Sequence, residues 1–289
     1  SPHEPGHKCM MMDGWQELSG ETQTSVAAVQ AFWQKVRASG ASGIKTDLRE
    51  GEQLCAMAFI KRRFARYFEQ VEISLPGSAQ KVFGWPVPYA VPSVAFIAAA
   101  PWIARLVEKG SIDAWQQFHA TASRITESSE LAHVGEARQR HNNVSDIEIR
   151  CVAEAARKRQ KSDDQFDPAW AGLDGQVYHR TQLQNVRIFE APAAQVNEVT
   201  QALRGLCASA GVGEEPSPYY AIVLMDGDQL GKYMGKAETR PRISAALNVF
   251  TRGVAERVRA HDGFLVYAGG DDVLALFPMA QALPAAAKL

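Results

Sequence analysis

The sequence has little cysteine and no paired cysteine motif. Among its 289 residues are four cysteines, Cys9, Cys55, Cys151 and Cys207, and no two of them form a C-x-x-C pair. This pattern supports neither a disulfide framework nor a zinc ribbon. It favours a reducing compartment, so we expect a cytoplasmic protein.

The chain also lacks a strong net charge and a long apolar run. Its formal net charge is −1, so any RNA contact must come from local patches or from partner subunits. The most apolar stretch, residues 94–104, is broken by Pro101 and is shorter than the roughly 20 residues that a membrane helix needs. No signal peptide is visible, and we expect no membrane partner. Because the sequence does not begin with Met, we expect a fragment.

The sequence does contain an ordered pattern over residues 219–278. An apolar run at residues 219–225 is typical of a buried strand and is followed by Asp226, Gly227 and Asp228. Apolar residues at three- and four-residue intervals predict a helix from about residue 241 to residues 262–263. Two short apolar segments then flank Gly-Gly-Asp-Asp at residues 269–272. This predicts a β-hairpin with acids at its tip.

Asp226, Asp271 and Asp272 would meet if the first strand lay beside the hairpin, as a split β-α-β arrangement allows. Gathered carboxylates repel one another unless a cation lies between them, and Mg²⁺ prefers one or two carboxylates with water and phosphates. Gly269 and Gly270 allow a tight turn and the close approach of a nucleotide. The tetrapeptide alone is equally well explained as a polar turn. The acids that end the preceding strand favour a functional site.

Four segments of the sequence resemble a known family. Residues 220–228 (YAIVLMDGD), 243–248 (ISAALN) and 267–275 (YAGGDDVLA) are similar to the second palm domain of the large subunit of type III CRISPR effector complexes, in particular the Cmr branch. Residues 91–102 (VPSVAFIAAAPW) resemble the same subunit. The resemblance implies a palm fold shared with nucleotide cyclases and polymerases, and conversion of ATP into cyclic oligoadenylate when target RNA is bound. It also implies guide RNA, target RNA and other Cmr-type subunits as partners.

The leading hypothesis is nucleotidyl transfer from ATP. Asp226, Asp271 and Asp272 are the candidate catalytic residues and the candidate ligands of Mg²⁺ or Mn²⁺. Glycines would leave room for the phosphates, and one lysine would supply a point charge. The candidate nucleotide-binding residues are Gly227, Asp228, Gly231, Lys232, Gly269 and Gly270.

Two alternatives remain open. One is a diguanylate cyclase or a polymerase-like nucleotidyltransferase, although the tip reads Gly-Gly-Asp-Asp-Val and lacks the Glu-Phe ending of the diguanylate family. The other is an inert palm that acts as a scaffold for guide RNA and partner subunits. Neighbouring carboxylates without a cation are costly, which argues against inertness.

The predicted fold class is α+β. We expect a ferredoxin-like palm of the cyclase and polymerase type over residues 216–289, incomplete at its C-terminal end, preceded by a mainly α-helical domain at residues 71–215. Residues 1–70 form a third region of helices and a degenerate zinc site. By the resemblance, the fragment lacks the N-terminal nuclease domain and the first palm.

The first region holds candidate zinc ligands, namely His7, Cys9 and Cys55. In the resembled family a cysteine-rich zinc site lies near this point. Here Met12 stands where a C-x-x-C motif needs its second cysteine, and a structural zinc site usually has four ligands. We therefore expect no zinc and interpret Cys55 as a core residue. The basic run at residues 61–66 predicts a solvated helix face rather than an RNA contact.

Overall fold

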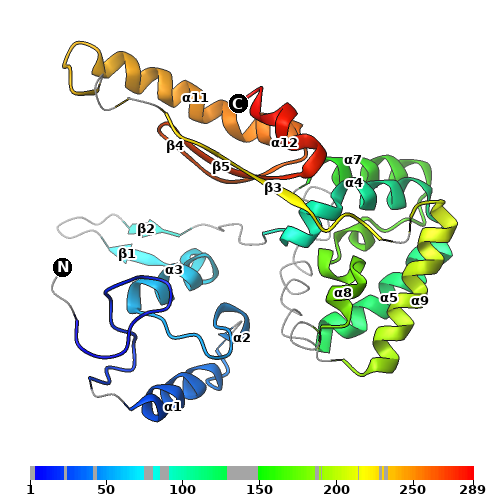
Figure 1. The fold of residues 1–289 in the computed structure, drawn as a ribbon, viewed down its shortest axis with the longest axis horizontal. Helices are drawn as coiled ribbons and strands as arrows, with labels where there is room; N and C mark the ends of the chain where they lie inside the picture. Colours follow the sequence, from blue (N-terminus) through cyan, green and yellow to red (C-terminus); the bar gives the residue numbers. More distant parts are fainter. Residues whose placement is uncertain are drawn as a thin grey trace. The chain divides into compact units, whose positions relative to one another are not determined.

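The protein is described by a computed structural model (Figure 1), which covers residues 4–22, 25–41, 44–74, 81–84, 91–128, 149–185, 189, 191–213, 215–227, 230 and 234–289. The chain divides into two compact units, residues 1–90 and 91–289. The sequence predicts boundaries near residues 70 and 215 instead. The structure places the helical region and the palm region in one unit.

The first unit has a small apolar core beneath two amphipathic helices. Its elements are α1 (Val26–Arg37), α2 (Ile44–Asp47), α3 (Ala56–Tyr67), the 3-10 turn η1 (Phe68–Gln70), and the antiparallel strands β1 (Glu72–Ser74) and β2 (Lys81–Phe83). Helix α1 buries Val29 and Trp33. The indole of Trp33 donates a 2.7 Å hydrogen bond to the buried carboxylate of Glu17, which satisfies a charge that would otherwise be costly to bury.

The helical part of the second unit is arranged around α4. Its elements are α4 (Val94–Lys109), α5 (Ile112–Ser128), α7 (Arg150–Ser162), the 3-10 turns η3 (Pro168–Gly172) and η4 (Gly175–Tyr178), α8 (Arg180–Leu183) and α9 (Ala193–Ala210). Helix α4 is buried on most of its surface and contains Pro101. It begins at Ser93, whose hydroxyl accepts a 3.2 Å hydrogen bond from the backbone of Phe96. The apolar stretch at residues 94–104 thus lies in a buried helix.

The palm is a sheet with helices on one side. Its elements are β3 (Tyr220–Met225), α11 (Arg240–Ala260), β4 (Phe264–Gly269), β5 (Asp272–Pro278) and α12 (Met279–Ala286). The described strands lie in the order β3-β5-β4, and both pairings are antiparallel. Strand, helix, strand, strand and helix are the first five elements of a ferredoxin-like fold. The predicted strand, helix and hairpin are therefore confirmed, but β3 is not the buried strand that its apolar run predicts. None of its residues is buried, and Ile222 and Leu224 are 61% and 73% exposed, because the described helices of the palm lie on one face of the sheet.

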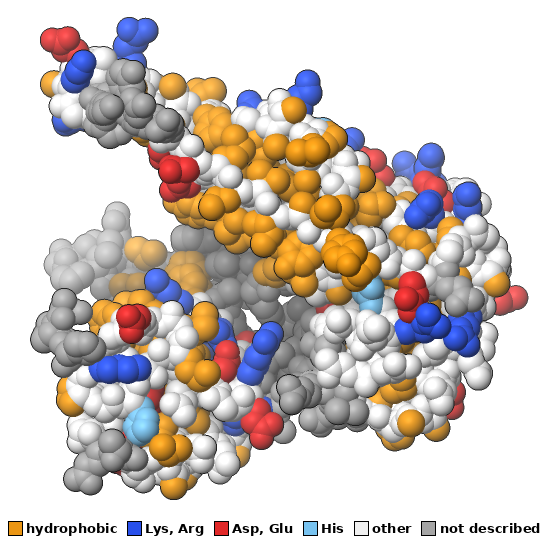
Figure 2. Space-filling model, viewed as in Figure 1, with side chains coloured by type: hydrophobic (Ala, Val, Ile, Leu, Met, Phe, Trp, Pro, Cys, Tyr) orange, Lys and Arg blue, Asp and Glu red, His pale blue; other side chains and the backbone are white. Residues whose placement is uncertain are grey.

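The two faces of the palm sheet differ. Helices α11 and α12 cover one face (Figure 1), and Val254, Val258, Val273 and Phe277 are buried there. On the other face, partly buried residues near the far end of the strands pack against the core of the helical part; these are Tyr220, Phe264 and Leu276. Towards the hairpin tip this face stays exposed, and hydrophobic side chains gather over the sheet (Figure 2).

Asp262 joins the palm to the helical part. It lies between α11 and β4 with φ 55°, and its carboxylate accepts a 2.9 Å hydrogen bond from the backbone N–H of Cys151 in the first turn of α7. The carboxylate thus satisfies one of the unpaired N–H groups at that helix end. Burial raises the pKa of Asp262, against the effect of this hydrogen bond. No helix in the described ranges is long and apolar enough to cross a membrane.

We predict that Asp262→Ala lowers the free energy of unfolding by ~1–2 kcal/mol, because α7 loses a cap and a non-glycine residue without a local hydrogen bond keeps a positive φ. Asp262→Asn is the matched control, since Asn keeps an acceptor and tolerates this conformation. Urea unfolding measures both. Equal stability of the Ala and wild-type chains would contradict the capping role.

Comparison of the wild-type chain with Asp262→Asn also yields a prediction about pH. Because the folded-state pKa of Asp262 is raised, its contribution to stability is fully present below the unfolded pKa of about 3.9 and is lost as the pH rises through the folded value. Relative to Asp262→Asn, the wild-type chain should therefore lose stability over that pH window.

Candidate active site

The register of β3 against β5 places two acids side by side. The last pair of the ladder is Met225 with Val273, so Asp226 and Asp272 occupy the next opposed positions. Side chains alternate between the faces of a sheet, and directly opposed residues share a face. Both aspartates therefore belong to the exposed face, away from α11 and α12. The predicted meeting of the first strand with the hairpin is confirmed.

The hairpin turn holds the third acid. Gly269 pairs with Asp272, which leaves Gly270 and Asp271 as the two turn residues. Gly270 has φ +64°, and two-residue hairpins favour glycine at such a position. The hydroxyl of Thr251 on α11 donates a 3.3 Å hydrogen bond to the carbonyl oxygen of Gly270. Thr251 carries no signal in the sequence, because the apolar spacing of α11 assigns it no role.

Gly227 permits the close approach of the two loops. A Cβ atom at Gly227 would overlap Cβ of Asp271 and lie 2.8 Å from its Oδ2 atom. Contacts this short are not adopted by real side chains, so a larger residue would displace Asp271. The sequence predicts that Gly227 leaves room for a ligand. The structure shows that it also leaves room for Asp271 of the turn.

The three carboxylates influence one another. The pKa of Asp272 is raised by loss of hydration, by the negative charges of Asp226 and Asp271, and by a hydrogen bond with Asp226. Asp226 and Asp272 are exposed, while Asp271 is partly buried. A carboxylate whose ionisation is disfavoured by neighbouring negative charge gains from a cation that neutralises that charge.

The acids at the tip offer the oxygen ligands that Mg²⁺ prefers, but they do not form a complete set of ligands by themselves. Carboxylate oxygens are the ligands that Mg²⁺ and Mn²⁺ prefer. Within the described residues, however, no group of three or more His, Cys, Asp or Glu side chains is placed to hold a metal ion. Mg²⁺ commonly uses one or two carboxylates with waters and substrate phosphates. The tip therefore fits a cation that arrives with its phosphate ligand. The remaining candidates Asp228, Gly231 and Lys232 lie outside the described residues.

The first unit gathers three sulfur atoms. Cys9 and Cys55 are buried, and the Cys55 thiol lies 3.7 Å from the Met12 sulfur. Backbone N–H groups donate to both thiols, from Met11 at 3.4 Å and from Ala58 at 3.5 Å. Burial opposes ionisation of Cys9, yet the hydrogen bonds from Cys55 and Met11 leave its pKa lowered. The expected core role of Cys55 is confirmed. The expected absence of zinc stays a prediction.

No contact in the described structure joins His7 to this sulfur cluster. Its Nε2 atom is buried and has no hydrogen-bond partner among the described residues. Of the three candidate zinc ligands, Cys9 and Cys55 are therefore neighbours. Among the described residues, His7 has no partner in common with them.

Two comparisons with known proteins agree with the palm geometry. Residues 219–289 match the family model described as Cas10/Cmr2, second palm domain. The chain is also 34% identical over 128 residues to the CRISPR system Cmr subunit Cmr2 of Pyrococcus furiosus, an alignment that covers 35% of this chain and 14% of that relative. The chain thus matches a small part of the relative's length. The resemblance stated from the sequence and the α+β palm fold are confirmed.

We predict that Mg²⁺ binding at the tip weakens as the pH falls. The raised pKa of Asp272 keeps this carboxyl protonated at pH values where an ordinary aspartate is charged, so protons compete with the cation. Carbon-13 NMR titration of the carboxyl groups measures this directly. The Asp272 pKa should fall when Mg²⁺ is added, and it should also fall in Asp226→Asn. A pKa that responds to neither change would contradict the proposed coupling.

Proposed function

Because residues 219–289 form a second palm domain of the Cas10/Cmr2 type, we propose that this chain serves in an RNA-guided type III CRISPR complex of the Cmr kind and that its palm binds ATP. When target RNA is bound to the complex, the palm tip takes part in making cyclic oligoadenylate. The observation that carries the proposal is the register that opposes Asp226 to Asp272 beside Asp271.

The tip residues have distinct tasks in this reaction. Asp226 and Asp272 present carboxylate oxygens on the exposed face, and Asp271 completes the negative charge from the turn. Mg²⁺ or Mn²⁺, when bound, supplies charge neutralisation for the triphosphate and a lower pKa for the attacking hydroxyl. In the reaction, the oxygen of a 3′-hydroxyl would form a bond to the α-phosphorus while its proton passes to solvent and the bond to pyrophosphate breaks. Gly227 lets the loop after β3 lie against Asp271, and Gly270 adopts the positive φ that the turn requires.

The exposed face of the palm sheet supports the view that the reaction needs a second protein surface opposite the acidic tip. Ile222 and Leu224 share the face of Asp226 and are 61% and 73% exposed. Contiguous exposed apolar residues mark interaction sites. In the resembled family a second palm faces the first and holds the other ATP. Positioning two nucleotides contributes on the order of 7–11 kcal/mol at best, so the chain alone should bind nucleotide weakly and turn it over hardly at all.

The inert-scaffold alternative rests on one observation, which is that no three-ligand metal group occurs in the described part of the chain. Separate incubations with labelled ATP, GTP and deoxynucleotides distinguish the remaining enzymatic alternatives, a diguanylate cyclase and a template polymerase. Product from ATP alone is the result expected for oligoadenylate synthesis.

We predict that replacing Asp271 and Asp272 together by Asn abolishes metal-dependent ATP turnover in a complete complex. Folding should be kept, since Asp→Asn preserves the size of both side chains and substitutions at the surface rarely cost more than ~0.5 kcal/mol. Asp164→Asn, an exposed change outside the palm, is the control and should remain active. Oligoadenylate synthesis by the double variant would contradict the assignment of Asp271 and Asp272 as catalytic residues.

The same assay on the isolated 289-residue chain tests the need for a second palm. We expect negligible pyrophosphate release with Mg²⁺ or Mn²⁺ across a range of protein concentration. Robust release at low concentration would show that one palm suffices.

A further inference from the structure

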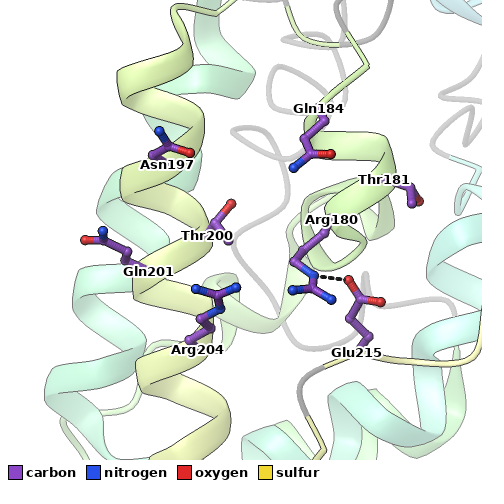
Figure 3. Close-up of a pocket in the computed structure, with 8 residues that line it drawn as sticks. All are labelled: Arg180, Thr181, Gln184, Asn197, Thr200, Gln201, Arg204 and Glu215. Carbon is purple, nitrogen blue, oxygen red and sulfur yellow. Dashed lines mark hydrogen bonds and ion pairs between the residues drawn. The ribbon is translucent and has the colours of Figure 1, made fainter.

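A polar pocket lies in the helical part of the second unit, outside the palm. It has a volume of about 400 Å³ and is formed by α8, α9 and the segment that follows α9 (Figure 3). This volume is within the range of about 300–1,000 Å³ that is usual for ligand sites. The lining side chains used below are Arg180, Gln184, Asn197, Thr200, Arg204 and Glu215. None belongs to the acidic tip, so the pocket is a separate site.

Helix α9 holds one wall of the pocket in a fixed position. Asn197, Thr200 and Arg204 are spaced three and four residues apart, so they share one side of the helix. The opposite side buries apolar residues in the large core of the second unit, among them Val199 and Leu206. Because the core fixes the helix, the polar side is presented without a large ordering cost.

Among the described residues that line the pocket, positive charge exceeds negative charge. Arg180 forms an ion pair with Glu215 through its Nε atom (Figure 3), and Arg204 adds a second guanidinium. The lining thus has two guanidinium groups and one carboxylate. The nearest acid along α9, Glu198, is not a lining residue and pairs with Arg124 of α5 at 3.1 Å.

Neutral hydrogen-bonding groups complete the lining. The side chains of Gln184 and Thr200 point into the space between α8 and α9 (Figure 3). The Thr200 hydroxyl donates a 2.8 Å hydrogen bond to the carbonyl oxygen of Val196 in its own helix, so the amides are the donors that remain for a ligand. Amides and hydroxyls both donate and accept, whereas a guanidinium only donates. This combination suits an anion that offers several acceptor oxygens in one plane or tetrahedron. Guanidinium groups recognise phosphate oxygens by paired, charge-assisted hydrogen bonds.

We propose that this pocket binds a phosphate ester, carried either by a single RNA strand or by a mononucleotide. Arg204 contacts the phosphate oxygens, and Arg180 is held for the same contact by Glu215. The amides of Gln184 and Asn197 provide further hydrogen bonds to the ligand. The proposal does not depend on chemistry at the palm tip.

Fluorescence anisotropy on the purified chain tests the proposal with two probes, a labelled single-stranded RNA oligonucleotide and labelled adenosine monophosphate. EDTA in the buffer removes divalent cations, which suppresses nucleotide binding at the acidic tip. Arg204→Gln should weaken binding on the order of tenfold or more, the size of a lost hydrogen bond to a charged group. For RNA it should also reduce the slope of log K against log salt by about one.

Glu215→Gln should have the opposite effect and strengthen binding, because it removes the negative charge from the lining and keeps an acceptor oxygen for Arg180. Arg157→Gln is the matched control, since Arg157 is an exposed arginine on α7 outside the pocket, and it should leave affinity unchanged. Thermal unfolding checks each variant, and Glu215→Gln decides the question if Arg204→Gln does not fold.

The pattern of binding identifies the source of the phosphate. Binding of RNA alone assigns a strand, and binding of adenosine monophosphate alone assigns a mononucleotide. No measurable binding of either probe, or equal affinities in the wild type, Arg204→Gln and Glu215→Gln, overturns the proposal. Neither result bears on the palm, because all three variants leave Asp226, Asp271 and Asp272 in place.

Discussion

The antiparallel ladder between β3 and β5 is the constraint on which the acidic tip depends. Backbone hydrogen bonds fix which residues of the two strands are opposed, and a slip by one residue would turn every side chain to the other face. The buried set under α11 and α12, including Val273 and Phe277, makes such a slip costly. Packing on one face of the sheet therefore determines that Asp226 and Asp272 appear together on the other.

Electrostatic repulsion at the tip is tolerated because the surrounding structure specifies the turn. Gly227 lies against Asp271, Thr251 holds the carbonyl of Gly270, and the ladder holds Asp272. The raised pKa of Asp272 is the expected consequence of carboxylates held near one another. A site of this kind gains stability when a cation and its phosphate ligand neutralise it, which links the packing of the palm to the proposed chemistry.

Local pattern was sufficient to predict the palm elements. The apolar run before Asp226 and the two short segments around Gly269 have the length and composition of strands. Between them, apolar residues recur at the three- and four-residue intervals of a helix. Their pairing order followed from a known arrangement of such elements rather than from the residues themselves. The close contact of Gly227 with Asp271 could not be read from the sequence, because it depends on where two loops meet in space.

Contacts between distant segments account for the other differences. Arg63 lies in a basic run that predicts a solvated face, yet it is 5% exposed and pairs with Asp47 at 2.9 Å, with its guanidinium 5.0 Å from the centre of the Tyr67 ring. Asp262 lies where the sequence predicts only the end of a helix, yet it caps α7 from 111 residues away. In both cases a side chain finds its partner only after the tertiary fold has formed.

The most direct test of the central claim is Mn²⁺ binding by electron paramagnetic resonance, with a non-hydrolysable ATP analogue present. The account predicts that the wild-type chain binds the Mn²⁺–nucleotide pair and that Asp226→Asn binds it at least about tenfold more weakly, as expected for loss of a charged ligand. Asp164→Asn should match the wild type. Equal binding by wild type and Asp226→Asn would show that the acidic tip is a polar hairpin turn and not a metal-nucleotide site.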